Sequence, residues 1–456
     1  MDVEKDEDKE IKLYKAEDLI EWAVAVLTSD NFCKAEGRGF PRKQALAAAR
    51  VLVEADLRGD KAHGLAGGSS LDDIFIKVND DREKLGFKRI EIAEYSVDNS
   101  KHPTMIYVDA HGTLGHYVAW NILPRIIETA ETNGPTMAFI RNSTHFGDCG
   151  IYSEELARND LIAMVTCTSP QWTKPFVELQ DSDENSTANR ERYEGVRKRF
   201  GTNPMAWSTP YEGGIVTIDM AATQRAVSPA IDVAKDNRAA LNIYKGKDGS
   251  LYVGAGGLRT KLKDVHLDLA RSNSDEELYT KLRKLGYDDS VEVYRVEEGL
   301  LKGPNGENIN YPLAFDEVFK QEFWIAPLGG TYYGYKGFGI NMTIELQNVF
   351  GGGVTGLIRV LNEQGNPTTP ERVSQTILAI PMNSREPVDQ VKARLKKSVD
   401  TTMQCSNGLV YLPGQKEQES RECRLVGGVP YDAQQRGKLK KIGHDVGMPF
   451  EVIPVK

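Results

Sequence analysis

The stretch Thr104-Met-Ile-Tyr-Val-Asp109 is an apolar run that predicts a β-strand. It is followed by a helical pattern over residues 117–131, which ends at Asn133-Gly134, and then by Pro135-Thr-Met-Ala-Phe-Ile-Arg141, which predicts a second strand. Strand, helix and strand in this order are typical of proteins in which the two kinds of element alternate. The segment therefore predicts an α/β fold.

The same alternation continues on both sides of this segment. Apolar periodicity predicts helices over residues 16–27, 41–56, 152–158 and 339–350, and strands over residues 161–167 and 374–380. Pro41 suits a first helical turn, and Gly59 suits a helix end. Residues 1–12 are polar and acidic and predict a mobile tail. Two polar stretches, 178–199 and 245–306, are interpreted as insertions that form solvated loops or small excursions.

Composition disfavours several classes of protein. The 456 residues include 57 Lys and Arg against 66 Asp and Glu, which gives a net charge of −9, and 40% of the residues are hydrophobic. An acidic balance disfavours nucleic-acid binding, and no apolar run reaches the length of a membrane span. The five cysteines lack CxxC spacing, so we expect neither a disulfide framework nor a metal site. The acidic N-terminus is unlike a signal peptide, and we expect a cytoplasmic globular protein.

One glycine-rich segment matches a dinucleotide-binding pattern in the wrong context. Gly351-Gly-Gly-Val-Thr-Gly356 satisfies GxGxxG, which binds pyrophosphate only between a strand and a following helix. Here the segment follows the helix predicted over residues 339–350. We therefore interpret it as a helix terminator and not as a Rossmann site.

Two of the seven histidines lie in loops beside glycine, next to predicted helices or strands. His63 lies in Arg58-Gly-Asp-Lys-Ala-His-Gly64, and His145 lies in Arg141-Asn-Ser-Thr-His-Phe-Gly147. A histidine in such a loop can approach a ligand closely and exchange a proton near neutral pH, as a general acid or base must. The alternative is that each ring caps a helix or bonds a backbone carbonyl. We assign no chemistry to His102, His111, His116, His266 and His444.

Three further segments are rich in small, hydroxyl and amide side chains, and we expect each to be a loop. They are residues 166–170, 200–206 and 327–339. Exposed backbone N–H groups, together with hydroxyls and the single lysine Lys336, can bind a phosphate without a Rossmann motif.

Taken in order, several of these motifs resemble a known family. THFGDCG at residues 144–150, FGTNP at 200–204, IDMA at 218–221 and PLGG…YKGFG at 327–339 are similar to motifs of the malate/L-lactate dehydrogenase family of type 2. Its members carry SHG, NHFG, GTNP, DMA and then PLGG with PKGYG. The tail segments LPGQ at 412–415 and GGVP at 427–430 also resemble the end of that family, so the resemblance runs from about residue 19 to residue 430.

The resemblance implies an NAD(P)-dependent oxidoreductase that transfers hydride to or from a small 2-oxo or 2-hydroxy carboxylic acid, malate-like or lactate-like. It implies a non-Rossmann cofactor-binding fold with a mixed, largely antiparallel sheet flanked by helices, and a homodimer. We expect residues 101–339 to form the cofactor-binding domain. Residues 13–100 together with 340–456 are expected to form a helical domain for dimerisation and substrate binding.

Site residues follow from the matched motifs. His63 matches the histidine of SHG and His145 that of NHFG, and both histidines have acid/base roles in the family. The expected contacts with NAD or NADP are Ser169, Asp219, Met220, Ala221, Gly334, Tyr335 and Lys336. No metal ion is implied.

Three departures from the family pattern concern substrate and phosphate contacts. Ala62 replaces the serine before the first histidine, Gly67 replaces an arginine expected to bind the substrate carboxylate, and Pro229 replaces a lysine. A bidentate guanidinium–carboxylate pair is not easily replaced. Arg58 or Arg141 is the candidate substitute for the missing arginine.

These departures leave two alternatives open: a homologue that binds cofactor without catalysis and acts as a scaffold or sensor, and a reductase of cyclic imine acids. If the chain is a catalyst, we expect His145 to be the more important histidine, because its motif is intact. The motif of His63 has lost the family serine and arginine, which are Ala62 and Gly67 here. His63 is then expected to act mostly through substrate affinity.

Overall fold

The computed structural model describes residues 11–68, 70–79, 88–98, 101–178, 180, 188, 191–192, 196–224, 242–245, 251–254, 260–261, 301–302, 308–309, 324–353, 372–407 and 409–455. The chain divides into two compact units. Unit 1 comprises residues 1–170, 203–220 and 342–456, and unit 2 comprises residues 171–202 and 221–341.

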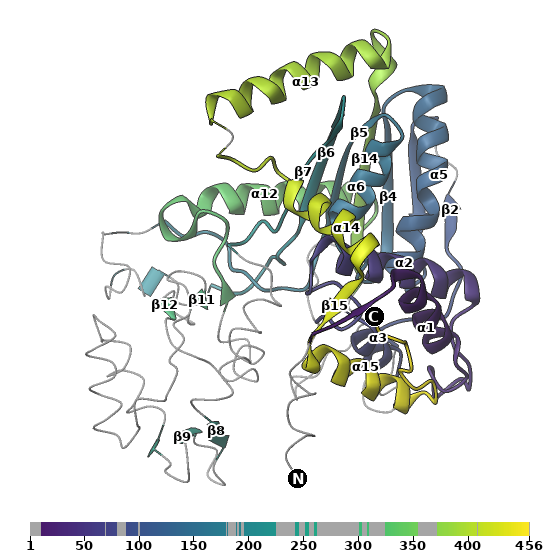
Figure 1. Cartoon of the computed structure of the whole chain (residues 1–456). Helices are drawn as coiled ribbons and strands as arrows, with labels where there is room; N and C mark the ends of the chain where they lie inside the picture. Colours follow the sequence, from purple (N-terminus) through teal and green to yellow (C-terminus); the bar gives the residue numbers. More distant parts are fainter. Residues whose placement is uncertain are drawn as a thin grey trace. The chain divides into compact units, whose positions relative to one another are not determined.

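Unit 1 is built on a seven-stranded sheet (Figure 1). In spatial order its strands are β2 (Ser96–Asp98), β3 (Met105–Asp109), β4 (Thr136–Ser143), β14 (Val373–Pro381), β5 (Leu161–Cys167), β6 (Met205–Tyr211) and β7 (Gly214–Met220). All neighbours are antiparallel except β3 and β4, which are parallel and are connected through helix α5 (Gly115–Asn133). A parallel pair needs such a crossover helix. The expected α/β fold with a mixed, largely antiparallel sheet is confirmed.

Two helices cover the sheet and bring the loop after β4 close to the loop after α2. Helix α5 packs on β4 and β14, and α6 (Cys149–Arg158) packs on β5, β6 and β7. Helix α2 (Arg42–Arg58) contacts α5 and α6 as well as α1 (Ala16–Thr28) and α14 (Gln415–Gly427). Because much of α2 is alanine and valine, neighbours can approach it closely from several sides, and most of its residues are buried.

The remaining elements of unit 1 lie around this core. They are β1 (Lys12–Tyr14), which pairs with β15 (Val429–Tyr431), η1 (Met382–Ser384), α3 (Leu71–Asn79), α13 (Val388–Cys405) and α15 (Ala433–Asp445). Lys12, assigned to the mobile tail from the sequence, therefore begins a strand. The buried rings of Tyr14 and Tyr431 lie 5.7 Å apart and explain why this end of the chain is held. Residues 1–10 lie outside the described residues.

The helices and strands predicted from periodicity are all found, within a few residues at their ends, except that the helix predicted over residues 339–350 begins at Gly330. Gly59 ends α2 with a positive φ of 91°, as expected. Helix α12 (Gly330–Phe350) ends directly before Gly351 to Gly353, which confirms that these three glycines of the GxGxxG match terminate a helix. Residues 354–356 of the match lie outside the described residues.

Two expected loops prove to be partly regular structure. Met205 and Ala206 begin β6, and residues 330–339 form the first half of α12. Two glycines of α12 are required by close packing, which sequence periodicity does not reveal. A Cβ on Gly334 would lie 2.9 Å from the Pro327 ring, and one on Gly337 would fall on the backbone of Leu328. The glycines let the helix lie close to the preceding chain.

In unit 2 the structure describes two small antiparallel sheets and the beginning of α12. The first sheet has the order β10 (Thr260–Lys261), β9 (Leu251–Gly254), β8 (Asn242–Lys245), and the second has the order β12 (Asn308–Ile309), β11 (Leu301–Lys302), β13 (Trp324–Ile325). Most of the two predicted insertions, and Pro229, lie outside the described residues.

Candidate functional site

The loop that follows α2 has a tight conformation with His63 at its centre. Asp60 Oδ1 accepts the N–H of Ala62 at 2.9 Å, and the buried Asp56 carboxylate accepts the N–H of Leu65 at 2.8 Å. A Cβ on Gly64 would collide with that Asp56 carboxylate. The loop therefore needs glycine beside His63 and is fixed by two carboxylates.

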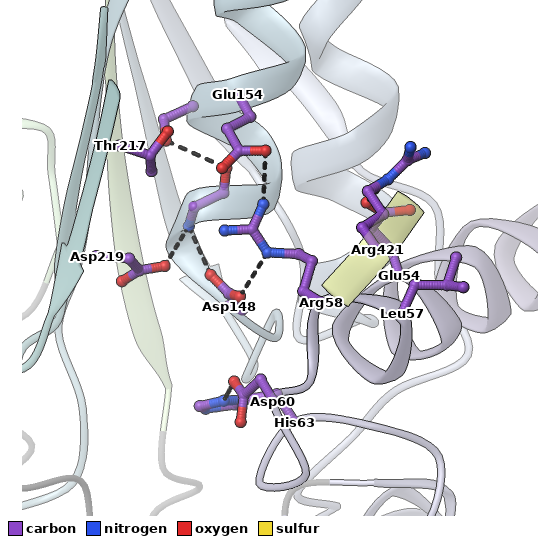
Figure 2. Close-up of polar contacts among 12 residues, drawn as sticks. Glu54, Leu57, Arg58, Asp60, His63, Asp148, Glu154, Thr217, Asp219 and Arg421 are labelled. Carbon is purple, nitrogen blue, oxygen red and sulfur yellow. Dashed lines mark hydrogen bonds and ion pairs between the residues drawn. The ribbon is translucent and has the colours of Figure 1, made fainter. Parts of the chain in front are cut away.

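The ring of His63 is paired with Asp60 (Figure 2). Its Nδ1 lies 2.5 Å from Asp60 Oδ2, so Nδ1–H donates to the carboxylate and Nε2 remains for a ligand. Burial lowers the pKa of His63, but the Asp60 charge and hydrogen bond, together with the Asp148 charge, outweigh it and raise the pKa above the ordinary 6.5. His63 is therefore the ring in this site that most readily carries a positive charge.

His145 lies in the loop between β4 and α6 and stacks on His63. The two ring centroids are 5.3 Å apart and the planes differ by 11°. The N–H of Gly147 donates to His145 Nδ1 at 3.2 Å, which leaves the proton of the neutral ring on Nε2. Burial, followed by the positive charges of His63, His116 and Lys77, lowers the pKa of His145 well below 6.5. The structure thus brings together both histidines singled out from the sequence, one favouring its charged form and one its neutral form.

A third histidine, which we did not assign from the sequence, belongs to the same cluster. His116 in the first turn of α5 is 1% exposed, and its ring lies 6.1 Å from that of His145. Within the part of the chain that the structure describes, neither of its ring nitrogens has a hydrogen-bond partner. Burial and the nearby charges of His63 and Lys77 lower its pKa to about 3. His116 is thus a neutral ring whose polar edges are unsatisfied beside the other two histidines.

A narrow pocket opens at the rings of His116 and His145. His116, His145 and Thr144 line it on one side, and Asp73 and Lys77 of α3 line it on another. Its apolar walls are Ile74, Ile90 and Leu114. The pocket has a volume of about 10 Å³, which is room for about one water molecule beside two imidazoles, one ammonium and one carboxylate.

Arg58 is enclosed by acidic side chains (Figure 2). Its Nη1 lies 2.6 Å from Glu154 and its Nε 3.3 Å from Asp148, and the side chain is 2% exposed. Asp148 and Asp219 both accept the N–H of Gly150, at 2.7 and 2.5 Å. This cluster ties the end of α2 to the beginning of α6 and to the end of β7. The guanidinium is therefore committed to carboxylates of the chain itself.

The other positions considered for a carboxylate clamp lie apart from the pocket lining. Arg141 pairs with Asp109 at 3.1 Å and with Asp98 at 3.7 Å. Neither Arg58 nor Arg141 lines the pocket. At Gly67 a Cβ would fall on the carbonyl of Ala62, whose oxygen also accepts the N–H of Gly68 at 3.0 Å. The loop thus has no room for an arginine at position 67.

The residues expected to contact cofactor are distributed over both units. In unit 1, Ser169 follows β5 and exchanges hydrogen bonds with Asn203, at 3.0 and 3.3 Å, while Asp219 and Met220 end β7. Ala221 lies in unit 2, as do Gly334, Tyr335 and Lys336 in α12.

The first turns of α12 carry side chains of the kinds that bind a dinucleotide. The Lys336 ammonium lies 5.4 Å from the ring of Tyr333 and 6.0 Å from that of Tyr335, and both tyrosines are exposed. A cation, two hydroxyls and aromatic faces match the phosphates and rings of such a molecule. Among the residues that the structure describes, no three acidic, histidine or cysteine side chains are arranged to hold a metal ion. No described helix is long and apolar enough to cross a membrane.

Comparison with known proteins adds evidence from outside the chain. Residues 27–181 match the family model described as malate/L-lactate dehydrogenase. Ureidoglycolate dehydrogenase (NAD(+)) of Escherichia coli O157:H7 is 27% identical over 212 residues, 46% of this chain and 52% of that relative. (2R)-3-Sulfolactate dehydrogenase (NADP(+)) of Chromohalobacter salexigens is 30% identical over 204 residues, 44% of this chain and 49% of that relative. The matched part spans about half the length of each of these relatives.

The fold has a close counterpart among solved structures. Malate dehydrogenase from Pyrococcus horikoshii OT3 superposes with a TM-score of 0.64 at 18% identity, over 96% of each chain. The likeness extends over both units of the chain and concerns the fold.

Proposed function

Because the chain belongs to the malate/L-lactate dehydrogenase family, we propose that it is an NAD(P)-dependent oxidoreductase acting on a small 2-oxo or 2-hydroxy carboxylic acid. The observation that carries the proposal is the His63–Asp60 pair, whose ring stacks on a neutral His145. Carbonyl reduction needs one proton delivered to oxygen, and a carboxylate-supported histidine can supply it.

His63 is the proton donor in this proposal. In the reducing direction Nε2–H of the charged ring gives its proton to the carbonyl oxygen, while Asp60 stabilises the imidazolium and fixes the ring orientation. In the oxidising direction the neutral ring takes the hydroxyl proton at Nε2. The bound nicotinamide supplies or accepts the hydride.

His145 orients the substrate and does not carry the proton. Its neutral Nε2–H can donate a hydrogen bond to the reacting oxygen, and the ring limits the movement of His63 through the stack. The pKa directions support this division of roles, which reverses the ranking that motif integrity favoured. We propose that NAD or NADP contacts Ser169, Asp219, Met220, Ala221, Gly334, Tyr335 and Lys336.

A titration with NADH and NADPH, followed by a turnover assay, tests this function. We expect saturable binding of at least one reduced cofactor and its consumption with at least one of oxaloacetate, pyruvate, phenylpyruvate or a cyclic imine acid. No binding of either cofactor, measured by fluorescence and thermal shift, contradicts the proposal. Tight binding without consumption of cofactor by any compound supports the scaffold or sensor, which the loss of the family arginine at Gly67 favours.

A further inference from the structure

The loop that carries His63 is bonded to the C-terminal part of the chain through a buried carboxylate. Asp56 lies in the last turn of α2, and its Oδ2 accepts two hydrogen bonds, from the N–H of Leu65 at 2.8 Å and from the hydroxyl of Tyr431 at 2.7 Å. Tyr431 ends β15 and is 0% exposed, and Asp56 is 3% exposed. One carboxylate oxygen therefore joins the backbone two residues after His63 to the C-terminal strand.

Two further donors of the C-terminal part reach the same stretch of chain. Arg424 of α14 donates from Nη1 to the carbonyl of Asp56 at 2.5 Å. Lys438 of α15 donates from its ammonium to the carbonyl of Ala66 at 2.9 Å. The last carbonyls of a helix and the carbonyls of a tight loop need such partners, because the chain around them supplies none. Side chains of α14, β15 and α15 thus bond the chain both before and after His63.

The charge of Asp56 depends on these donors. Burial raises the pKa of Asp56 to about 7, and the charge of Asp60 adds to this rise. The hydrogen bonds from Tyr431 and Leu65 act in the opposite direction, as does the positive charge of Arg424. An ionised carboxylate accepts stronger hydrogen bonds than a neutral carboxyl group does. The tyrosine hydroxyl therefore strengthens the bond between the carboxylate and the loop.

We propose that Tyr431 is a positioning residue for His63, which it holds in place through the Asp56 carboxylate. This inference rests on the proposed function, in which His63 is the proton donor. Without the hydroxyl, the carboxylate keeps only the Leu65 N–H of the two donors and accepts it less strongly. The loop is then held less firmly, and the imidazole can move away from Asp60. A displacement of about 1 Å at a reacting group can lower a rate by as much as a hundredfold.

Nitrogen-15 NMR of the labelled full chain tests the proposal without requiring turnover. Tyr431→Phe removes the hydroxyl and keeps the buried ring. We expect the Leu65 amide hydrogen to exchange with solvent about tenfold faster or more, the usual consequence of a lost hydrogen bond to a charged group. We expect His63 to titrate at lower pH than in wild type, because its pairing with Asp60 weakens. In the turnover assay kcat should fall by about tenfold, while the affinity for reduced cofactor stays unchanged.

A second variant removes a different contact of the same loop. Lys438→Met removes the bond to the Ala66 carbonyl from a half-buried surface position, and we expect smaller changes in the same direction. The matched controls are Tyr14→Phe, which removes the hydroxyl of the neighbouring buried ring 5.7 Å from that of Tyr431, and Lys440→Met, an exposed lysine of the same helix α15. Both controls should leave the titration of His63 as in wild type.

The proposal is overturned if Tyr431→Phe leaves the Leu65 exchange rate and the His63 titration as in wild type, or if Tyr14→Phe changes them equally. Wild-type kcat in Tyr431→Phe also overturns it. If Tyr431→Phe lowers the melting temperature sharply, Lys438→Met decides instead, and a wild-type titration of His63 in that variant contradicts the proposal. Failure of the proposed function has a different signature, the absence of NAD(P)H consumption by wild type while the NMR changes in Tyr431→Phe persist.

Discussion

Replacing His63 by alanine is expected to lower kcat for reduction by about a hundredfold or more, the usual loss when a general acid is removed. The reason is the geometry at Asp60: the carboxylate 2.5 Å from Nδ1 favours the charged ring and directs Nε2 toward a ligand. His145→Ala should lower kcat less than His63→Ala does, and it should raise KM more. Asp60→Asn should act in the same direction as His63→Ala, because an amide cannot stabilise the imidazolium.

Steady-state kinetics with the substrate found in the turnover assay provide the measurement. His444→Ala is the matched control, since that side chain is 91% exposed and should leave kcat unchanged. Because reduction needs the charged ring, kcat/KM for reduction should fall as the pH rises through the raised pKa of His63. The oxidation rate should rise over the same interval. Near wild-type turnover in His63→Ala, with loss of turnover in His145→Ala, would restore the ranking expected from the sequence.

The second large effect concerns stability. Arg58→Met is expected to lower the free energy of unfolding by about 3–5 kcal/mol, the usual range when one member of a buried ion pair is removed. The substitution leaves Asp148 and Glu154, which are 9% and 1% exposed, without the guanidinium between them. Because this cluster joins the end of α2 to α6, the loop that carries His63 should lose order as well.

Urea denaturation measures this change, and Arg158→Met is the control. Arg158 also contacts Glu154, at 3.3 Å, but its side chain is 38% exposed. Its removal should cost no more than about 1 kcal/mol, because the Arg158 guanidinium is partly exposed and Glu154 keeps Arg58 as its partner. If the two variants lower the free energy of unfolding equally, the buried cluster does not hold α2 and α6 together. A folded Arg58→Met protein with only a raised KM would instead favour direct substrate binding by Arg58.

The regular elements were predictable where the apolar period was clear. Residues 104–109, 135–141 and 161–167 alternate or run apolar over a strand's length, and each is found as a strand. The α12 segment was predicted only from residue 339, because the glycines before it disfavour a helix in isolation. Those glycines are required by packing against Pro327 and Leu328, which sequence periodicity does not report.

The two histidine loops of the candidate site were predictable from the sequence, but most of the residues that surround the histidines were not. The motifs indicated His63 and His145, and the loops carrying them do meet. The sequence around His63 does indicate Asp60, since an acid three residues before a loop histidine can reach its Nδ1. Nothing in the sequence near the two loops indicates His116 or Lys77, because these residues join the site only through the packing of α5 and α3 against the loops. The lack of space at Gly67 also depends on the folded loop.

The protonation states of the stacked histidines test the account most directly. Nitrogen-15 NMR of the labelled full chain can follow each imidazole over the pH range in which the protein stays folded. We expect His63 to titrate above 6.5 with its Nδ1 protonated, and His145 to remain neutral with Nδ1 unprotonated at pH values where His63 is charged. A spectrum in which His145 gains its proton at higher pH than His63 would contradict the assignment of His63 as the proton donor.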